Sequence, residues 1–198
     1  MDAVSAAFEA IPREGFLPPT LRRQAAYDGP LPIGHDQTSS QPRTVADMLR
    51  LLDVQPALRV LDVGAGSGWT TALLAHLTGP AGSVDGVELV PELVTFGAGN
   101  LAATHQPWAR IHQAVDGVLG WPPGAPYDRI LVSAEADRLP APLVAQLAAP
   151  DEAGAGPARL VIPVAGVMLL VRRVGDDLDD PAAVQVTRHG YYRFVPLL

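Results

Sequence analysis

The chain of 198 residues contains no cysteine, which excludes disulfides, thiolate metal sites and a cysteine nucleophile. Its five histidines show no H-E-x-x-H spacing, so no metal site is predicted. No apolar run reaches the length of a membrane span, and the N-terminus lacks a basic and apolar signal pattern. We therefore expect a cytoplasmic protein that has no membrane partner.

Positive charge is also scarce. Basic residues number 14 against 21 acidic ones, which gives a net charge of −7, and no basic run is present. A nucleic-acid backbone is therefore not an expected partner. The length suits a single domain, residues 1–198, with a core of its own.

The first 57 residues predict a helical N-terminal cap. Apolar residues at helical spacing predict a helix over 4–11, which stops at Pro12. A proline-studded stretch continues to Ile33. A second, amphipathic helix is predicted over 42–52, with Pro42 in its first turn, where a missing N–H is harmless.

Strands and helices alternate over residues 58–198, which predicts an α/β fold with a mostly parallel sheet and helices on both faces. A final antiparallel pair is expected over 167–174 and 184–195, and residues 151–157 read as a mobile surface loop. The remaining strands are predicted at 58–63, 82–88, 109–113, 127–133 and 158–164, and the helices at 68–78, 91–104 and 139–148.

A glycine loop joins the first predicted strand of this region to its helix. It reads Asp62-Val63-Gly64-Ala65-Gly66-Ser67-Gly68. Glycines here let backbone approach a ligand closely at a helix N-terminus. A dinucleotide fingerprint needs G-x-G-x-x-G, so a nicotinamide dehydrogenase is disfavoured. The acid-x-G-x-G-x-G pattern resembles the loop of S-adenosylmethionine (SAM) methyltransferases, which implies cofactor contacts from Asp62, Gly64, Ala65, Gly66, Ser67 and Gly68.

Two further acids follow in order along the chain. Glu88, followed by Leu89, ends a predicted strand about twenty residues past the loop, where a carboxylate accepts hydrogen bonds from ribose hydroxyls. The plainer alternative is an exposed glutamate at a strand end. Asp116-Gly117 follows the next strand, and resemblance to methyltransferases places this acid against the adenine amino group. By itself it would read as a turn residue.

Residues outside the glycine loop indicate the family. Residues 31–42 read Leu-Pro-Ile-Gly-His-Asp-Gln-Thr-Ser-Ser-Gln-Pro. They resemble the "LPIG" and "G-Q-T-I-S-x-P" signature of protein-L-isoaspartate O-methyltransferases. Other matching segments occur in the family's order over nearly the whole chain, namely 13–18, 120–122, 128–132, 146–147, 160–164 and 193–197. The resemblance implies a Rossmann-like SAM-dependent methyltransferase fold.

The resemblance further implies methyl transfer from SAM to an isoaspartyl carboxylate of a damaged protein or peptide, with S-adenosyl-L-homocysteine as product. The acceptor would be a peptide or protein and the enzyme a monomer. Ser40 matches the family's active-site serine and would orient the acceptor, with Thr38 completing that wall. The alternative is that Ser40 only caps the helix that begins at Pro42.

Three positions depart from the family pattern. Asp36 replaces a glycine, Ser39 replaces an isoleucine, and Glu135 stands where small residues are usual. A carboxylate facing the acceptor pocket would repel a carboxylate substrate by roughly 4 kcal/mol before screening. Asp36 and Glu135 therefore either point to water or indicate a different acceptor, such as an aspartate in a specific peptide. The family also extends past the "V-P-L" that ends here, which predicts lower cofactor affinity. A SAM-binding protein without catalysis is the remaining alternative.

Overall fold

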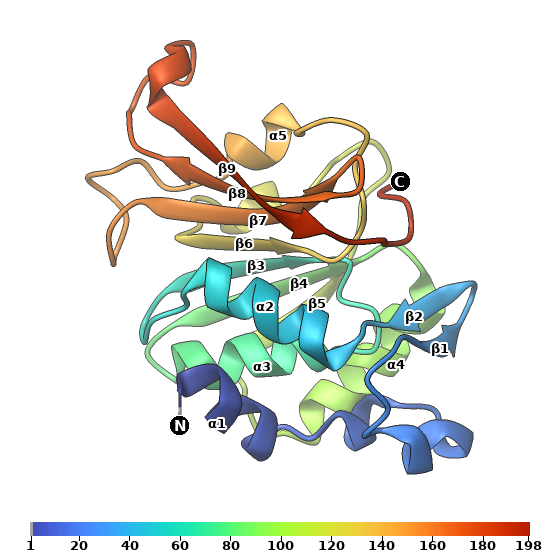
Figure 1. Cartoon of the computed structure of the whole chain (residues 1–198). Coiled ribbons are helices and arrows are strands. Elements are labelled where there is room, and N and C mark those ends of the chain that lie inside the picture. Colours follow the sequence, from blue (N-terminus) through green and yellow to red (C-terminus); the bar gives the residue numbers. More distant parts are fainter. Residues whose placement is uncertain (1) are drawn as a thin grey trace.

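The computed structural model describes residues 2–198 and contains a seven-stranded sheet with helices on both faces (Figure 1). The strand order is β5-β4-β3-β6-β7-β8-β9, and β1 and β2 form a separate hairpin. The strands are β1 Leu31–Gly34, β2 Gln37–Ser39, β3 Arg59–Val63, β4 Ser83–Glu88, β5 Ala109–Gln113, β6 Arg129–Val132, β7 Ala158–Val164, β8 Val167–Arg173 and β9 Val184–Tyr191. The helices are α1 Ala3–Ala10, α2 Pro42–Leu52, α3 Trp69–Thr78, α4 Pro91–Ala102 and α5 Ala141–Val144, with 3-10 turns η1 Arg13–Phe16, η2 Pro19–Gln24, η3 Pro122–Gly124 and η4 Pro181–Ala183.

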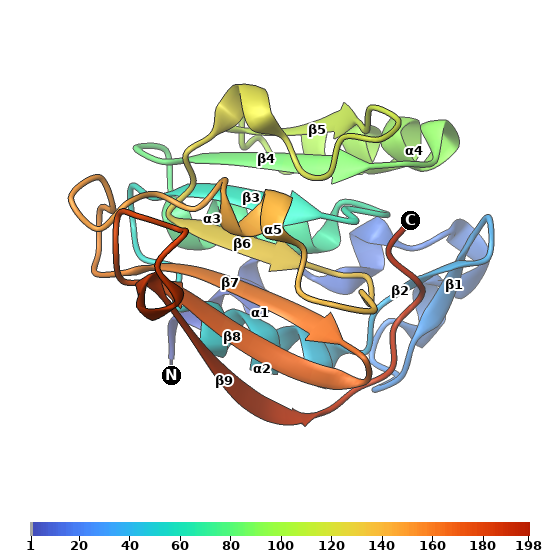
Figure 2. The same cartoon turned by 90° about the horizontal axis from the view of Figure 1, so that it is seen from above.

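Strands β5, β4, β3, β6 and β7 run parallel, so their carboxyl ends meet at one edge of the sheet (Figure 2). Strands β8 and β9 continue the sheet in antiparallel pairing. This arrangement confirms the predicted α/β class with its C-terminal antiparallel pair. In open α/β sheets the carboxyl edge is where ligands bind.

The sheet separates two apolar clusters because successive side chains of a strand point to opposite faces. Val60 of β3 belongs to a cluster with residues of α1, α2, α3 and the end of α4, whereas its neighbour Leu61 belongs to a cluster with residues of α5. Four helices therefore cover one face, and the single short helix α5 lies on the other (Figures 1 and 2). Residues of the N-terminal segment, including Val4, Phe16 and Val45, belong to the first cluster.

The N-terminal 57 residues contain a hairpin that the sequence did not predict, between the two predicted helices. Residues 31–39 form the β1–β2 hairpin, with Leu31 opposite Ser39. His35 and Asp36 make its turn and have φ of 54° and 56°. Two successive positive φ angles are typical of the type I′ turn, which matches the twist of hairpin strands. The glycine that the family places at residue 36 is explained by this turn, since glycine adopts positive φ freely.

Helix α5 is shorter than the predicted 139–148. The backbone N–H of Tyr127 donates to the Gln146 carbonyl at 2.8 Å, and the N–H of Ala148 donates to the Tyr127 carbonyl at 2.8 Å. These bonds draw residues 145–148 into a bridge beside Tyr127, so the helix ends at Val144. Strand β9 likewise ends at Tyr191, before the predicted residue 195.

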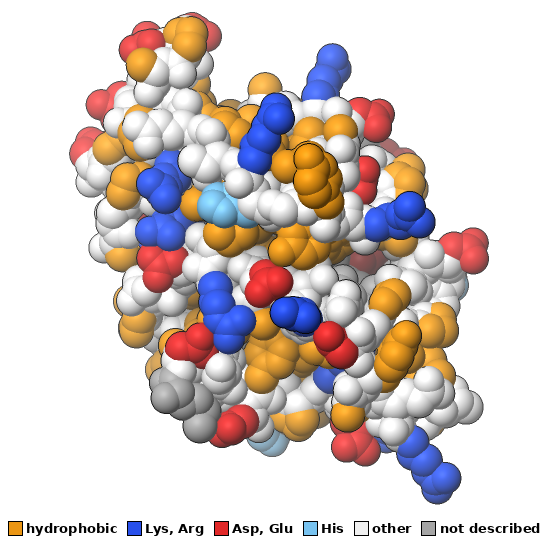
Figure 3. All heavy atoms as spheres, in the orientation of Figure 1, with side chains coloured by type: hydrophobic (Ala, Val, Ile, Leu, Met, Phe, Trp, Pro, Cys, Tyr) orange, Lys and Arg blue, Asp and Glu red, His pale blue; other side chains and the backbone are white. Residues whose placement is uncertain are grey.

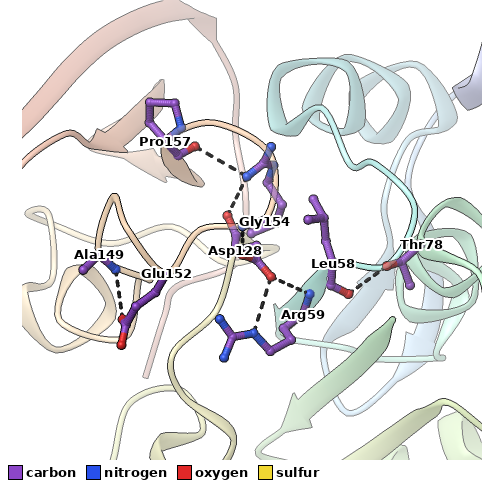
Figure 4. Close-up of polar contacts among 9 residues, drawn as sticks. Leu58, Arg59, Thr78, Asp128, Ala149, Glu152, Gly154 and Pro157 are labelled. Atoms are coloured by element: carbon purple, nitrogen blue, oxygen red, sulfur yellow. Dashed lines mark hydrogen bonds and ion pairs between the residues drawn. The ribbon is translucent and has the colours of Figure 1, made fainter. Parts of the chain in front are cut away.

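Asp128 and Arg129 organise the opposite end of the sheet from the carboxyl edge. Asp128 accepts the N–H of Arg59 and of Gly154, both at 2.8 Å (Figure 4). The buried Arg129 donates to the carbonyls of Ala155 and Pro157, and burial lowers its pKa to about 10. The segment 151–157, which the sequence suggests is mobile, is thus held at three residues. Asp128 and Arg129 begin the segment 128–132 that matches the family, and their role here is structural.

Candidate active site

A cavity of about 830 Å³ opens at the carboxyl edge of the parallel strands. Six segments enclose it: the β1–β2 hairpin, the loops after β3, β4, β5 and β6, and the C-terminal tail. The position is the one expected for a ligand site in a doubly wound sheet. Its lining residues are Ile33, Gln37, Thr38, Val63, Gly64, Gly66, 87–90, 114–120, Ala134, 136–142 and 195–198.

The glycine loop after β3 forms the floor of the cavity. Gly64, Gly66 and Gly68 have φ of 81°, 53° and 84°, a region that favours glycine. Gly64 and Gly66 line the cavity, whereas Gly68 turns inward, where a Cβ would lie 2.8 Å from the Gly97 carbonyl oxygen. Ala65 and Ser67 are buried and are not among the lining residues, so the loop contributes Gly64 and Gly66 to the cavity.

Helix α4 supports this loop through two residues that the sequence did not reveal. A Cβ on Gly97 would lie 2.7 Å from the Gly66 carbonyl oxygen, so only glycine allows this approach. Asn100 donates from Nδ2 to the Ser67 carbonyl at 3.0 Å. The sequence has glycine at both 97 and 99 within the predicted helix, so it does not distinguish the glycine that packs against the loop.

Glu88 holds its carboxylate at the cavity wall. The carboxylate accepts the N–H of Gly66 at 2.8 Å and that of Val90 at 2.9 Å, and the residue is 7% exposed. Each oxygen keeps a further acceptor site for a ligand hydroxyl. The neighbouring Leu89 lines the cavity and is 40% exposed. This is not the freely solvated strand-end glutamate of the plainer alternative.

Asp116 and Gly117 lie on the loop after β5, beside the Glu88 wall. Both line the cavity and are exposed, and Gly117 has φ of 73°. Val115 and Val118 expose apolar side chains on the same loop. The N–H of Val118 donates to the Val115 carbonyl, so Asp116 is both a turn residue and a cavity residue.

Asp62 lies beneath the glycine loop and does not line the cavity. It is fully buried, and its Oδ2 accepts the hydroxyls of Thr70 and Thr71 at 2.8 and 2.7 Å. Its Oδ1 has no hydrogen-bond partner among residues 2–198. Burial raises the pKa of Asp62 to about 6. In this structure, Asp62 joins the loop to the first turn of α3.

The β1–β2 hairpin contributes another part of the cavity wall. Thr38 and Gln37 line the cavity, while Ser39 points inward. Ser40 is half-buried and is not among the lining residues. It does not cap α2 either, because Gln41 is the N-cap residue and Asp28 accepts the N–H of Arg43 in the first turn. The capping alternative for Ser40 is therefore wrong.

The buried Arg13 fixes this hairpin. Its guanidinium donates to the Ser39 hydroxyl at 3.0 Å, the Ser39 carbonyl at 2.8 Å, and the carbonyls of Tyr27 and Gly29. It also lies 5.5 Å from the ring centroid of the buried Trp69, the first residue of α3. Burial lowers the pKa of Arg13. The departure Ser39 thus supplies an acceptor for a buried cation.

The other two departures lie outside the cavity lining. Asp36 is exposed at the hairpin turn. Glu135 accepts the N–H of Phe194 at 3.4 Å, and its backbone brackets Pro196 in a parallel bridge. Glu135 therefore anchors the tail, whose residues Val195–Leu198 line the cavity. The repulsion considered for these two carboxylates has no basis in this arrangement.

No helix within residues 2–198 is long and apolar enough to cross a membrane. Over the same described residues, no three histidine or acidic side chains gather closely enough to hold a metal ion.

Glycine backbone forms the floor of this cavity, the Glu88 carboxylate borders it, and loops that expose apolar side chains follow β4 and β5. The fold and site define a SAM-dependent methyltransferase. The family model "Protein-L-isoaspartate(D-aspartate) O-methyltransferase (PCMT)" matches residues 1–198. The chain belongs to the protein-L-isoaspartate O-methyltransferase family.

Individual relatives agree with this assignment. A protein-L-isoaspartate O-methyltransferase of Aeropyrum pernix is 43% identical over 192 residues, covering 97% of this chain and 71% of its own. One from Methanocella arvoryzae is 40% identical over 193 residues, covering 96% and 95%. Among solved structures, the Plasmodium falciparum PCMT protein in complex with S-adenosyl-L-homocysteine has a TM-score of 0.80 and 25% identity, covering 100% of this chain and 91% of that one.

Proposed function

We propose that this protein transfers the methyl group of SAM to the carboxylate of L-isoaspartyl residues in damaged proteins or peptides. One observation carries the proposal. Glu88 and Asp116, to which we assign the nucleoside, line the same cavity as Gln37 and Thr38, which belong to the family's acceptor motif. Donor and acceptor would therefore meet within one cavity. The methylated residue then cyclises to a succinimide, whose hydrolysis returns some normal aspartate.

The reaction makes few demands on acid–base groups. Bound SAM supplies an activated methyl group, and S-adenosyl-L-homocysteine leaves as product. An acceptor carboxylate with a pKa near 4 is already ionised at neutral pH, so no general base is needed. Among the residues that line the cavity there is no histidine. The protein has to orient the acceptor oxygen and exclude water, a role that rests on position.

The site residues divide between the two substrates. Gly64, Gly66 and their supporting neighbours Asp62, Ala65, Ser67 and Gly68 shape the floor beneath the cofactor. Glu88 accepts from ribose, with Leu89 beside it, and Asp116–Gly117 borders the adenine. Thr38 presents a hydroxyl to the acceptor carboxylate. Ser40 directly follows the hairpin and does not line the cavity, so its side chain would have to turn toward the acceptor when the substrate binds.

The partner would be a peptide or protein, met by the monomer in the cytoplasm, with no nucleic-acid partner. Acidic and basic side chains are intermingled on the face in Figure 3, without one large basic field. Such a surface is compatible with many protein substrates, because strong steering by charge of one sign is absent.

The test is methyl transfer from labelled SAM to two peptides that differ only in an isoaspartyl or an aspartyl residue. We expect turnover on the isoaspartyl peptide alone, and a loss of about a hundredfold in kcat/KM for Ser40→Ala if its hydroxyl orients the acceptor. SAM binding should be unchanged in that variant. Intact SAM binding without turnover on the isoaspartyl peptide would reject the proposed acceptor.

A further inference from the structure

Of the described residues 2–198, Arg138 is the only basic one that lines the cavity. It belongs to the loop between β6 and α5, is exposed, and makes no hydrogen bond or ion pair with another described residue. Arg13, which is buried behind the hairpin, by contrast donates to Ser39, Tyr27 and Gly29. A guanidinium free to donate in a fork geometry suits a carboxylate.

Strand order separates Arg138 from Glu88 and Asp116. Along the carboxyl edge, Asp116 follows β5, Glu88 ends β4, the glycine loop follows β3, and Arg138 follows β6. The two acids thus lie on the nucleoside side of the glycine loop, and the arginine lies on the other side. Asp137 is the acidic neighbour of Arg138 and also lines the cavity. Arg138 is therefore separated by the glycine loop from Glu88, the acid to which we assign the ribose.

From this arrangement we propose that Arg138 is a specificity-determining residue that binds the acceptor carboxylate. The proposal rests on the proposed function, because it takes the acceptor to be a carboxylate. SAM carries a sulfonium and an ammonium against a single carboxylate, so the cofactor as a whole gains little from a further cation. The carboxylate of SAM is nevertheless the group that could bind Arg138 in place of the acceptor.

The chemistry predicts which kinetic constant Arg138 controls. During methyl transfer the acceptor oxygen forms a bond to the methyl carbon as the sulfonium–methyl bond breaks, and the electron pair of that bond stays on sulfur. An anion and a cation become a neutral ester and a neutral thioether. An arginine on the acceptor therefore interacts more strongly with the ground state than with the transition state. Arg138 should lower the peptide KM without raising kcat, and its pairing should weaken once the ester has formed.

The experiment compares the wild type with Arg138→Ala and Arg138→Lys in steady state on the isoaspartyl peptide, with SAM affinity measured by calorimetry. We expect Arg138→Ala to raise the peptide KM about tenfold, with kcat unchanged or slightly higher and SAM affinity unchanged. Arg138→Lys should recover part of the lost affinity, since it keeps the charge but not the fork. The KM of the wild type, but not of Arg138→Ala, should rise with salt.

Arg188→Ala is the matched control, because Arg188 is exposed on β9 and does not line the cavity. It should leave the peptide KM within about twofold of the wild type, which excludes a general effect of net charge. A normal KM for Arg138→Ala, or weakened SAM affinity in place of a raised peptide KM, would overturn the assignment while the proposed function stands. A wild type that does not methylate the peptide would remove the proposed function and this inference together.

Discussion

Asp36 shows how one residue can depart from a family pattern without touching the chemistry. Its φ of 56° in the hairpin turn is one that a side chain adopts at a cost, and aspartate is among the residues that tolerate it. The departure therefore concerns the stability of the hairpin that carries Thr38. The carboxylate itself lies outside the cavity lining.

Asp36→Gly should raise the free energy of unfolding by about 0.5 kcal/mol. Glycine removes the backbone strain of the left-handed conformation, and this gain should exceed the entropic cost of a more flexible unfolded chain. Thermal or denaturant unfolding measures the change. Gly34→Ala is the opposite control, since Gly34 has φ of 94° with no atom within 4 Å of an added Cβ, so only backbone strain is introduced. A destabilised Asp36→Gly would mean that the Asp36 side chain stabilises the turn by more than its strain.

Asp62 predicts a pH dependence at the same scale. Its pKa is about 6 when folded, against a reference of 3.8. Between these values the folded state holds a proton that the unfolded state has lost, so the stability contributed by Asp62 falls as pH rises through this window. Asparagine at this position does not titrate. The free energy of unfolding of Asp62→Asn, relative to that of the wild type, should therefore increase by up to about 3 kcal/mol as the pH rises from 4 to 7. Unfolding curves at several pH values measure this, and a difference that does not change with pH would contradict it.

At the scale of elements, the contact between α4 and the glycine loop determines whether the cofactor floor keeps its shape. Gly97→Ala would place a Cβ 2.7 Å from the Gly66 carbonyl oxygen and 2.9 Å from Ile111 Cδ1. The loop must shift, so we expect SAM affinity to fall at least about tenfold, measured by calorimetry.

Gly99→Ala is the matched control in the same helix. Nothing lies within 4 Å of a Cβ at Gly99, so the change adds only helix propensity. It should stabilise the protein by up to about 1 kcal/mol and leave SAM affinity unchanged. Equal losses of affinity in both variants would show that α4 as a whole, and not the close contact at Gly97, supports the loop.

The elements also show which features the sequence could predict. The glycine loop, the parallel strands and the position of Glu88 follow from local patterns of apolar residues, glycines and acids. The β1–β2 hairpin was missed because its His35–Asp36 turn lacks the usual Asn-Gly or Asp-Gly signal. The early end of α5 depends on backbone bonds to Tyr127, and the role of Gly97 depends on a loop thirty residues away. Such long-range contacts leave no local pattern.

At the scale of the whole molecule, cofactor binding should stabilise the fold. The cavity joins loops from four parallel strands to the hairpin and the tail, so a ligand there contacts segments from both ends of the chain. At a SAM concentration of 100 times Kd, the gain is about 2.7 kcal/mol, seen as a higher Tm. Glu88→Ala should abolish most of this shift. A Tm that rises equally in both proteins would place the cofactor elsewhere.

The measurement that tests the account most directly is a crystal structure with S-adenosyl-L-homocysteine and an isoaspartyl peptide bound together. The account predicts ribose hydroxyls within hydrogen-bond distance of Glu88, and the peptide carboxylate between the Thr38 hairpin and Arg138. A cofactor bound away from Gly64 and Gly66, or a peptide carboxylate outside the cavity, would contradict it.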